Sequence, residues 1–241
     1  MFPLGEGLDL GSGVRVAVDD AYAIVWDLIT EERKHKIERV IGQRTFAASV
    51  VLENIYDRGN SSAVMRTAEA LGFAQVDLIE TGDRFKAANR VTKGADKWLE
   101  VTRWLTTADC VKALRAQGKR IVATHLDATA KPIAEIDFSV PTALVLGNEK
   151  DGISREMQAL ADDRVILPMV GFVQSYNISV AAALALYHIY QDRVRRLGRQ
   201  GDLTARQMKI LSLAYAMRTQ DSSWDTLREL VARGQLNALR P

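Results

Sequence analysis

The 241-residue sequence contains a single cysteine, Cys110, and only three histidines. One cysteine cannot form a disulfide within the chain, so a disulfide-stabilised scaffold is excluded and a reducing compartment is favoured. One thiol and three scattered imidazoles are also too few for a thiolate or imidazole metal cluster. We therefore expect no structural metal, and a cytoplasmic protein or, after processing of a precursor, an organellar one.

The sequence also lacks a long apolar run. Its mean hydropathy is -0.08, and its longest apolar-leaning stretch, residues 178–190, is shorter than the roughly 18 residues that a membrane-spanning helix needs. Residues 1–13 show no basic region followed by an apolar core, so we expect no secretory signal. With 47% hydrophobic and 26% charged residues, the composition is typical of a soluble protein with a buried core.

The net charge is only +2, because 32 Lys and Arg oppose 30 Asp and Glu, and it indicates little about partners. Two stretches are locally basic. Residues 31–44 carry five Lys or Arg against three Glu, and residues 191–218 carry seven against two Asp. Each stretch has two interpretations, a solvated helix face or an RNA-binding surface.

Between residues 46 and 197, short apolar segments alternate with amphipathic ones. The apolar segments predict strands at 46–52, 76–79, 99–104, 120–123, 143–146 and 165–167. Helices are predicted at 61–71, 108–117, 154–161 and 175–197. Strands and helices alternating at this spacing are typical of a mostly parallel sheet covered on both faces, so we predict an α/β fold.

Helical patterns flank this region on both sides, at 19–42, 204–218 and 224–233. The sequence therefore predicts four parts, which are an N-terminal tail (1–18), a basic helical extension (19–45), the α/β domain (46–197) and a C-terminal helical extension (198–241).

Residues 8–13, Leu-Asp-Leu-Gly-Ser-Gly, are similar to the glycine-rich nucleotide loop of Rossmann-type methyltransferases. Such a loop must follow a strand and open a helix, but only a few residues precede this one. Arg15 also stands where a third glycine would be needed. We therefore interpret residues 8–13 as part of a flexible tail.

Three polar segments, at 54–66, 146–152 and 167–183, each follow a predicted strand. The first predicts a helix capped by Asn60 or Ser61. The glycines of the second allow a ligand to approach the backbone closely, as happens at strand ends of open α/β sheets. The third enters an alanine-rich helix through Ser-x-Asn-x-Ser. Helix caps, a tight turn and close helix packing would explain all three without a ligand.

Taken in order, these segments resemble the three signature motifs of the SpoU/TrmH branch of the SPOUT methyltransferases, and the resemblance covers about residues 31–191. It implies that the C-terminal part of the α/β domain forms a deep trefoil knot that binds S-adenosylmethionine (SAM). It also implies a homodimer that methylates ribose 2′-hydroxyls of RNA.

Within the branch, the basic segment 31–44, the C-terminal extension and Lys97-Trp98 resemble the tRNA (guanosine-18-2′-O)-methyltransferases. This implies methylation of guanosine 18 in the D-loop of tRNA. The alternatives are 2′-O-methylation of rRNA or of another tRNA nucleoside, and an RNA-binding homologue without catalysis. Nothing in the sequence itself reads a base, so the choice of substrate depends on the resemblance.

The resemblance assigns roles residue by residue. The implied catalytic residues are Asn60, Arg66, Glu149, Ser175 and Asn177. The implied cofactor-binding residues are Thr124, Gly147, Asn148, Glu149, Lys150, Asp151, Leu167 and Tyr176. Isoleucine is common in the family where Leu167 stands, and leucine where Tyr176 stands. From the two basic stretches we expect RNA contacts by Arg33, Lys36, Arg39, Arg44, Arg195, Arg196 and Arg199.

The implied family role of Arg66 is activation of the 2′-hydroxyl. A guanidinium has a pKa above about 12 and rarely gives up its proton. We therefore expect Arg66 to stabilise the developing alkoxide charge and to orient a phosphate. A phosphate oxygen or a water molecule would then take the proton.

Overall fold

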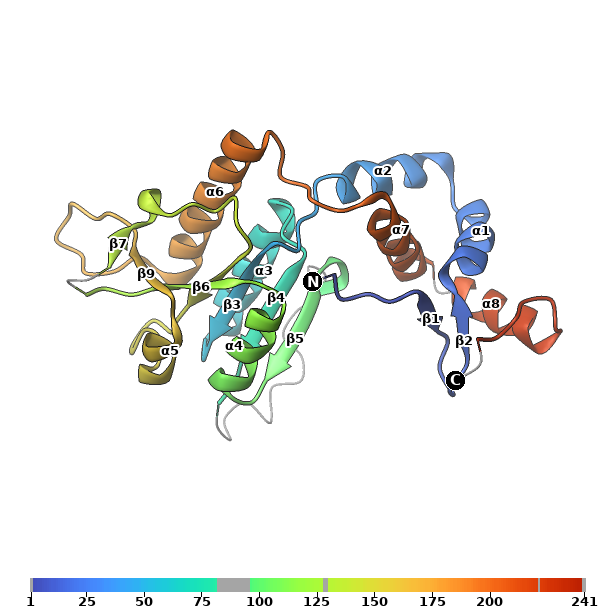
Figure 1. Ribbon diagram of the computed structural model, residues 1–241, viewed down its shortest axis with the longest axis horizontal. Helices are drawn as coiled ribbons and strands as arrows, with labels where there is room; N and C mark the ends of the chain where they lie inside the picture. Colours follow the sequence, from blue (N-terminus) through green and yellow to red (C-terminus); the bar gives the residue numbers. More distant parts are fainter. Residues whose placement is uncertain (1, 82–95, 128–129, 221, 240–241) are drawn as a thin grey trace. The chain divides into compact units, whose positions relative to one another are not determined.

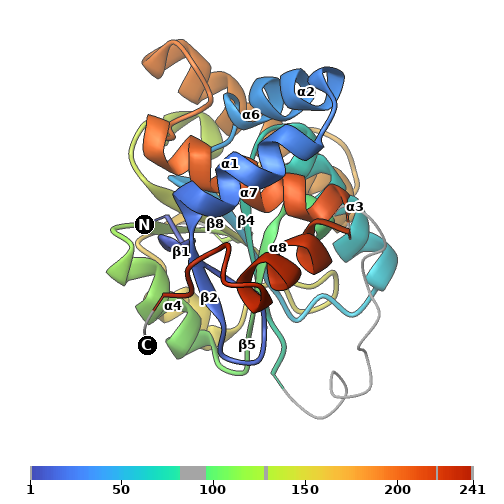
Figure 2. The ribbon, with the colours of Figure 1, turned by 90° about the vertical axis from the view of Figure 1, so that its right-hand side faces the viewer.

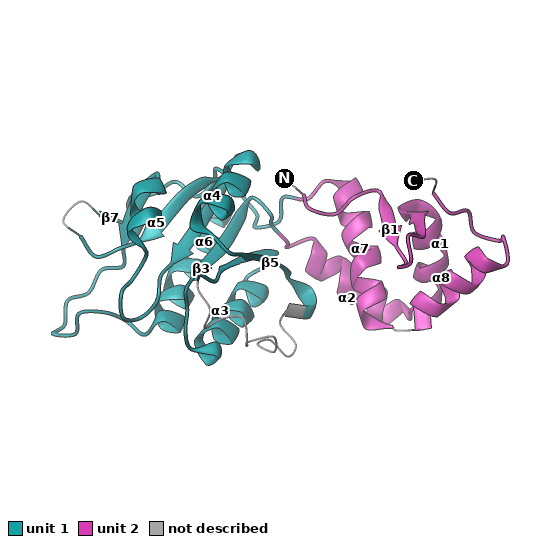
Figure 3. Ribbon diagram, turned by 90° about the horizontal axis from the view of Figure 1, so that it is seen from below, with its two compact units in different colours: residues 1, 45–202 teal, residues 2–44, 203–241 magenta. Residues whose placement is uncertain are grey.

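The computed structural model describes residues 2–81, 96–127, 130–220 and 222–239. The chain forms two compact units (Figure 3). Unit 1 comprises residues 45–202, and unit 2 combines residues 2–44 with residues 203–241. The sequence predicts two separate helical extensions, whereas the structure joins them in one unit because helices from both ends of the chain pack together.

Unit 1 is built on a seven-stranded sheet in the order β5-β4-β3-β8-β6-β9-β7, and neighbouring strands run parallel (Figure 1). The strands are β3 (Ala48–Glu53), β4 (Gln75–Ile79), β5 (Glu100–Trp104), β6 (Arg120–Thr124), β7 (Lys131–Pro132), β8 (Thr142–Leu146) and β9 (Asp163–Ile166). The predicted α/β class is therefore confirmed. The two-residue edge strand β7 is too short to give a sequence signal.

Helices cover both faces of the sheet (Figure 1). One face packs against α3 (Arg58–Ala70) and α6 (Ile178–Leu197), and the other against α4 (Thr107–Ala116) and α5 (Arg155–Leu160). Successive strand residues point to opposite faces. Val50 and Leu52 of β3 therefore enter the core beneath α3 and α6, while Val51 packs with α4 and α5. Two short 3-10 helices, Asp96–Trp98 and Ile133–Glu135, complete unit 1.

Unit 2 is largely helical. It contains the antiparallel pair β1 (Gly7–Asp9) and β2 (Arg15–Ala17) and four helices, α1 (Val18–Leu28), α2 (Glu31–Ile41), α7 (Ala205–Thr219) and α8 (Ser222–Ala232). Helix α1 lies beside α7 and α8 (Figure 2). The single helix predicted at 19–42 is two helices, because the chain is extended at Ile29 and Thr30 and the Thr30 side chain caps α2.

The expectation that residues 8–13 belong to a flexible tail is wrong. Gly11, Ser12 and Gly13 all have positive φ angles and form the turn between β1 and β2. Leu10 and Val16 are buried in the core of unit 2. The glycines of residues 8–13 thus serve a hairpin rather than a nucleotide loop. None of the described helices is both long and apolar enough to cross a membrane.

Candidate active site

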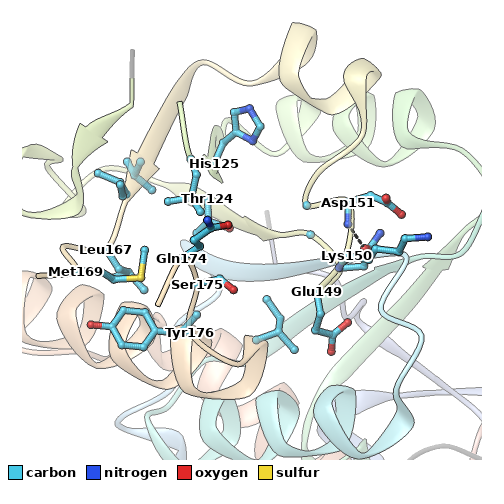
Figure 4. A pocket seen from close by; sticks show the side chains of 18 residues that line it. Thr124, His125, Glu149, Lys150, Asp151, Leu167, Met169, Gln174, Ser175 and Tyr176 are labelled. Atoms are coloured by element: carbon cyan, nitrogen blue, oxygen red, sulfur yellow. Dashed lines mark hydrogen bonds between the residues drawn. The ribbon is translucent and has the colours of Figure 1, made fainter. Parts of the chain in front are cut away.

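A cavity of about 410 Å³ lies at the carboxyl ends of β6, β8 and β9 (Figure 4). Its walls come from residues 124–126, residues 147–152 and the chain between residues 165 and 181. Ligands of open parallel sheets bind at this edge, and the volume lies in the range of cofactor sites. All eight residues to which the resemblance assigns cofactor binding line this cavity, and so does Ser175.

The turn after β8 is held by its own hydrogen bonds. The backbone N–H groups of Asn148 and Gly152 each donate to the other residue's carbonyl, at 3.1 and 3.0 Å. The Asn148 side-chain oxygen accepts from the backbone of Lys150 at 2.9 Å and of Asp151 at 2.7 Å. A Cβ on Gly147 would lie 2.1 Å from the carbonyl carbon of Gly152, so only glycine fits there. This closed turn, which we call the cofactor loop (residues 147–152), forms one wall of the cavity.

Asn60 connects the three polar segments. Helix α3 is capped by Asp57, whose carboxylate accepts from the Asn60 backbone N–H at 3.0 Å, so the predicted cap at Asn60 or Ser61 is wrong. The Asn60 side chain is left to interact elsewhere. It donates to Glu149 Oε1 at 2.5 Å, and its Oδ1 accepts from Asn177 Nδ2 at 3.5 Å.

The third segment is extended before it becomes helical. Asn177 caps α6, accepting from the Ser179 backbone at 2.9 Å and from its hydroxyl at 2.6 Å. The helix predicted from residue 175 therefore begins at Ile178. This leaves Ser175 and Tyr176 on the cavity wall, where the Tyr176 hydroxyl donates to the Pro168 carbonyl at 3.1 Å.

Arg66 lies apart from the cavity. It is exposed on α3, six residues beyond Asn60, in a shallow depression shared with Ala183 and Tyr187 of α6. Within the described ranges its guanidinium makes no hydrogen bond or ion pair, so the charge is free to meet a substrate. Asn60, Glu149 and Asn177 are thus joined by hydrogen bonds, whereas Arg66 lies further along α3, away from them.

Further residues also line the cavity, among them His125, Leu126, Met169 and Gln174. The sequence analysis did not single them out. Their only sequence signal is position, because each lies within two residues of the end of β6 or inside the third polar segment.

Three predicted RNA-contacting residues share one face of α2. Arg33, Lys36 and Arg39 are exposed and three residues apart, which places them in a row on the helix. None of them has a charged partner in the part of the chain that the structure describes. Arg44 is a correction, since only 1% of its surface is exposed and its guanidinium lies 5.8 Å from the centre of the Tyr215 ring.

The basic residues at the end of α6 are largely neutralised. Arg195 and Arg196 both pair with the carboxylate of Asp192, and Arg196 also approaches Asp137 at 3.5 Å. Of the three arginines predicted here, Arg199 alone is both exposed and without a partner among the described residues. The free cations of the two basic stretches are therefore concentrated on α2.

The parallel sheet with helices on both faces, and the cavity at its strand ends, define a cofactor-binding α/β protein. Residues 47–187 match the SpoU rRNA Methylase family, and the chain belongs to that family. The resemblance on which the sequence interpretation depends is thereby confirmed.

Similar proteins include both tRNA and rRNA enzymes. The chain is 38% identical to the tRNA (guanosine(18)-2′-O)-methyltransferase of Escherichia coli (strain K12) over 67% of this chain and 70% of that protein. The structure of the TrmH/SpoU tRNA modifying enzyme of A. aeolicus matches with a TM-score of 0.70 and 28% identity, over 78% and 97% of the two chains. The AdoMet-bound rRNA methyltransferase of Sinorhizobium meliloti matches with a TM-score of 0.54 and 30% identity, over 64% and 59%.

Proposed function

We propose that this protein transfers a methyl group from SAM to the ribose 2′-hydroxyl of guanosine 18 in tRNA. The observation that carries the proposal is the junction of Asn60, Glu149 and Asn177, which brings all three polar segments together beside a cofactor-sized cavity. The choice of guanosine 18 is supported by the named E. coli relative.

The cavity residues fit SAM. Leu167, Met169 and Ile178 provide apolar walls for a ring and an aliphatic chain, while the cofactor loop presents backbone groups and the side chains of Glu149 to Asp151. When bound, SAM supplies a methyl carbon on a sulfonium, so that the O2′–C bond forms as the C–S bond breaks and S-adenosylhomocysteine leaves.

The chain's own groups orient the acceptor and manage its proton. Asn60 holds Glu149 and Asn177 in fixed positions at the cavity, so that a ribose can be aligned with the cofactor. Arg66 lies apart from the cavity of its own chain. We therefore assign it to the second copy of the homodimer proposed here, where its fork of N–H donors stabilises the developing alkoxide charge and orients a phosphate. The hydroxyl proton passes to a phosphate oxygen or to water, because the guanidinium keeps its own.

We also propose a homodimer and a trefoil knot, both of which the family resemblance implies. The dimer is supported by an apolar row on α6, where Val180, Leu184 and Tyr187 are 47%, 45% and 55% exposed. Arg66 lies beside this row, sharing its depression with Tyr187. Covering the row with a second copy would bring that copy next to Arg66 and complete the surface on which RNA lies. The knot would be formed by the C-terminal part of unit 1.

The test is nucleoside mass spectrometry of an unmodified tRNA transcript incubated with the protein and isotopically labelled SAM. We expect labelled 2′-O-methylguanosine, and we expect it to disappear when guanosine 18 is changed to adenosine. Label in an rRNA fragment instead would favour the second candidate substrate, which the S. meliloti enzyme represents. Cofactor binding without label in either RNA would overturn catalysis and leave an RNA-binding protein.

A further inference from the structure

A carboxylate outside the assigned site is buried beneath the cofactor loop. Glu53 is the last residue of β3, near the middle of the sheet, and is 1% exposed. Three donors reach it. Its Oε1 accepts from the hydroxyls of Thr107 at 2.8 Å and Ser154 at 2.7 Å, and its Oε2 accepts from the Ser154 backbone N–H at 2.8 Å.

Glu53 has no cationic partner among the described residues. Burying a carboxylate is costly unless hydrogen bonds satisfy its oxygens, and the three donors meet this need. Thr107 is also the first residue of α4, where the helix dipole favours negative charge. A buried acid kept at this cost, where an apolar residue would pack, points to a task other than stability.

The hydrogen bonds of Glu53 fix one end of the cofactor loop. Ser154 follows the loop after a single residue, the buried Ile153. The other end of the loop continues from β8, whose Leu146 is paired in register with Leu52, the residue before Glu53. Strand β3 therefore holds both ends of the loop, the first through the sheet ladder and the second through the Glu53 carboxylate.

We propose that Glu53 is a positioning residue for cofactor binding, acting through Ser154 on the cofactor loop. The proposal rests on the proposed function in one respect, that the ligand of this loop is SAM. Without the carboxylate, the cofactor loop keeps its internal hydrogen bonds, but its second end is no longer held to β3 through Ser154. The cavity wall that contacts the cofactor therefore shifts.

Thr107 and Ser154 provide a matched pair, because both hydroxyls donate to the same oxygen but only Ser154 adjoins the loop. We expect Ser154→Ala and Glu53→Gln to raise the SAM Kd in calorimetry by about 10-fold or more, the size typical of lost supporting contacts around a bound group. We expect Thr107→Ala to leave the Kd within about 2-fold.

Ser154 also caps α5 by accepting from the Met157 backbone N–H at 3.0 Å, so a cycle with the Glu53→Gln/Ser154→Ala double variant is required. If Glu53 and Ser154 act through the hydrogen bonds between them, the double variant raises the Kd no further than the larger of the two single variants does. Independent, additive effects would overturn the proposal.

Two other results would also count against this role. Equal rises in Kd for Thr107→Ala and Ser154→Ala, in proportion to their losses of melting temperature, would show a merely structural carboxylate. Unchanged affinity in every variant, with normal SAM binding by the parent protein, would remove the inference and leave the proposed function standing. A parent protein that does not bind SAM would overturn both. Should Glu53→Gln fail to fold, the comparison of the two hydroxyl variants still decides.

Discussion

The side-chain amide of Asn60 donates to the carboxylate of Glu149, joining residues 89 positions apart in the chain. The same side chain accepts from Asn177. Asn60 is able to do this because Asp57 takes over the capping of α3 through the backbone N–H of residue 60. The cap therefore does not depend on the Asn60 side chain, which makes Asn60 a good site for substitution.

Replacing Asn60 by alanine or aspartate separates its two roles. Asn60→Ala removes the links to Glu149 and Asn177, and we expect kcat to fall by about 10- to 100-fold. Asn60→Asp places a second carboxylate against Glu149, and two adjacent carboxylates cannot both ionise freely. We therefore expect Asn60→Asp to be less active than Asn60→Ala, because it sets a negative charge against Glu149 whereas Asn60→Ala only removes the links. Equal turnover of the two variants would contradict the bridge.

Much of this site could be predicted from the order of the motifs. Strands ending in polar residues imply a shared edge, because a parallel sheet brings the carboxyl ends of its strands together. The resemblance assigned cofactor contacts to Thr124, Gly147 and Leu167, and the structure places all three around one cavity at that edge. Family membership then followed from motif order.

Side-chain partners were harder to predict. Asp57, Asn60 and Ser61 are all good helix caps, and only the path of the preceding loop selects Asp57. Arg44 contributes to a basic run, but its burial depends on Tyr215, which is far away in sequence. The pairing of Arg195 and Arg196 with Asp192 was visible as i,i+3 and i,i+4 spacing, yet a count of net charge does not register it.

Gly147 tolerates no side chain. In Gly147→Ala the new Cβ would collide with the backbone of Gly152, so the loop must open to admit it. We expect SAM affinity to fall by about 100-fold or more, since strain of a few kcal/mol is transferred to the cavity wall. Gly171→Ala is the control, because a Cβ there meets nothing within 4 Å. Calorimetric titration of both variants checks this, and equal affinities would show that the cofactor does not need the closed turn.

Arg66 is exposed and unpaired among the described residues, so its substitution leaves the fold intact. Arg66→Lys keeps the charge but loses the fork of donors, and we expect kcat to fall by roughly 100-fold, as when an oxyanion donor is removed. Arg58→Lys, the same substitution in the first turn of α3, serves as the control. Near-normal turnover of Arg66→Lys across a pH–rate series would show that fork geometry is irrelevant.

The exposed row on α2 predicts a salt-dependent RNA affinity. Replacing Arg33, Lys36 and Arg39 together by alanine should flatten the plot of log affinity against log salt by about two, at about 0.7 per lost contact with a single strand. The triple variant Arg195→Ala, Arg196→Ala and Arg199→Ala should change the slope less, because Arg195 and Arg196 already pair with Asp192, and Arg196 also approaches Asp137. Filter binding at several salt concentrations measures both slopes. A larger change for the α6 variant would reverse the assignment of the RNA-binding surface.

Lys119 predicts a pH dependence of stability that is separate from catalysis. Burial lowers the pKa of its ammonium to about 8 from an ordinary 10.5, although Asp77 nearby opposes the shift. Its Nζ donates to Gln75 Oε1 at 2.7 Å, and Gln75 in turn donates to Asp77 at 2.8 Å. Between pH 8 and 10.5 the unfolded chain holds more protons at this lysine than the folded chain does.

The contribution of Lys119 to the free energy of unfolding therefore rises as the pH increases through this window, by roughly 3 kcal/mol at most. Lys119→Met should lose that rise, whereas the exposed Lys112→Met should keep it. Urea unfolding of the three proteins at about pH 7.5, 8.5 and 9.5 compares the slopes rather than the absolute stabilities, so it is insensitive to the packing change at position 119. A slope that persists in Lys119→Met would mean that this ammonium titrates at the same pH in the folded and unfolded chains.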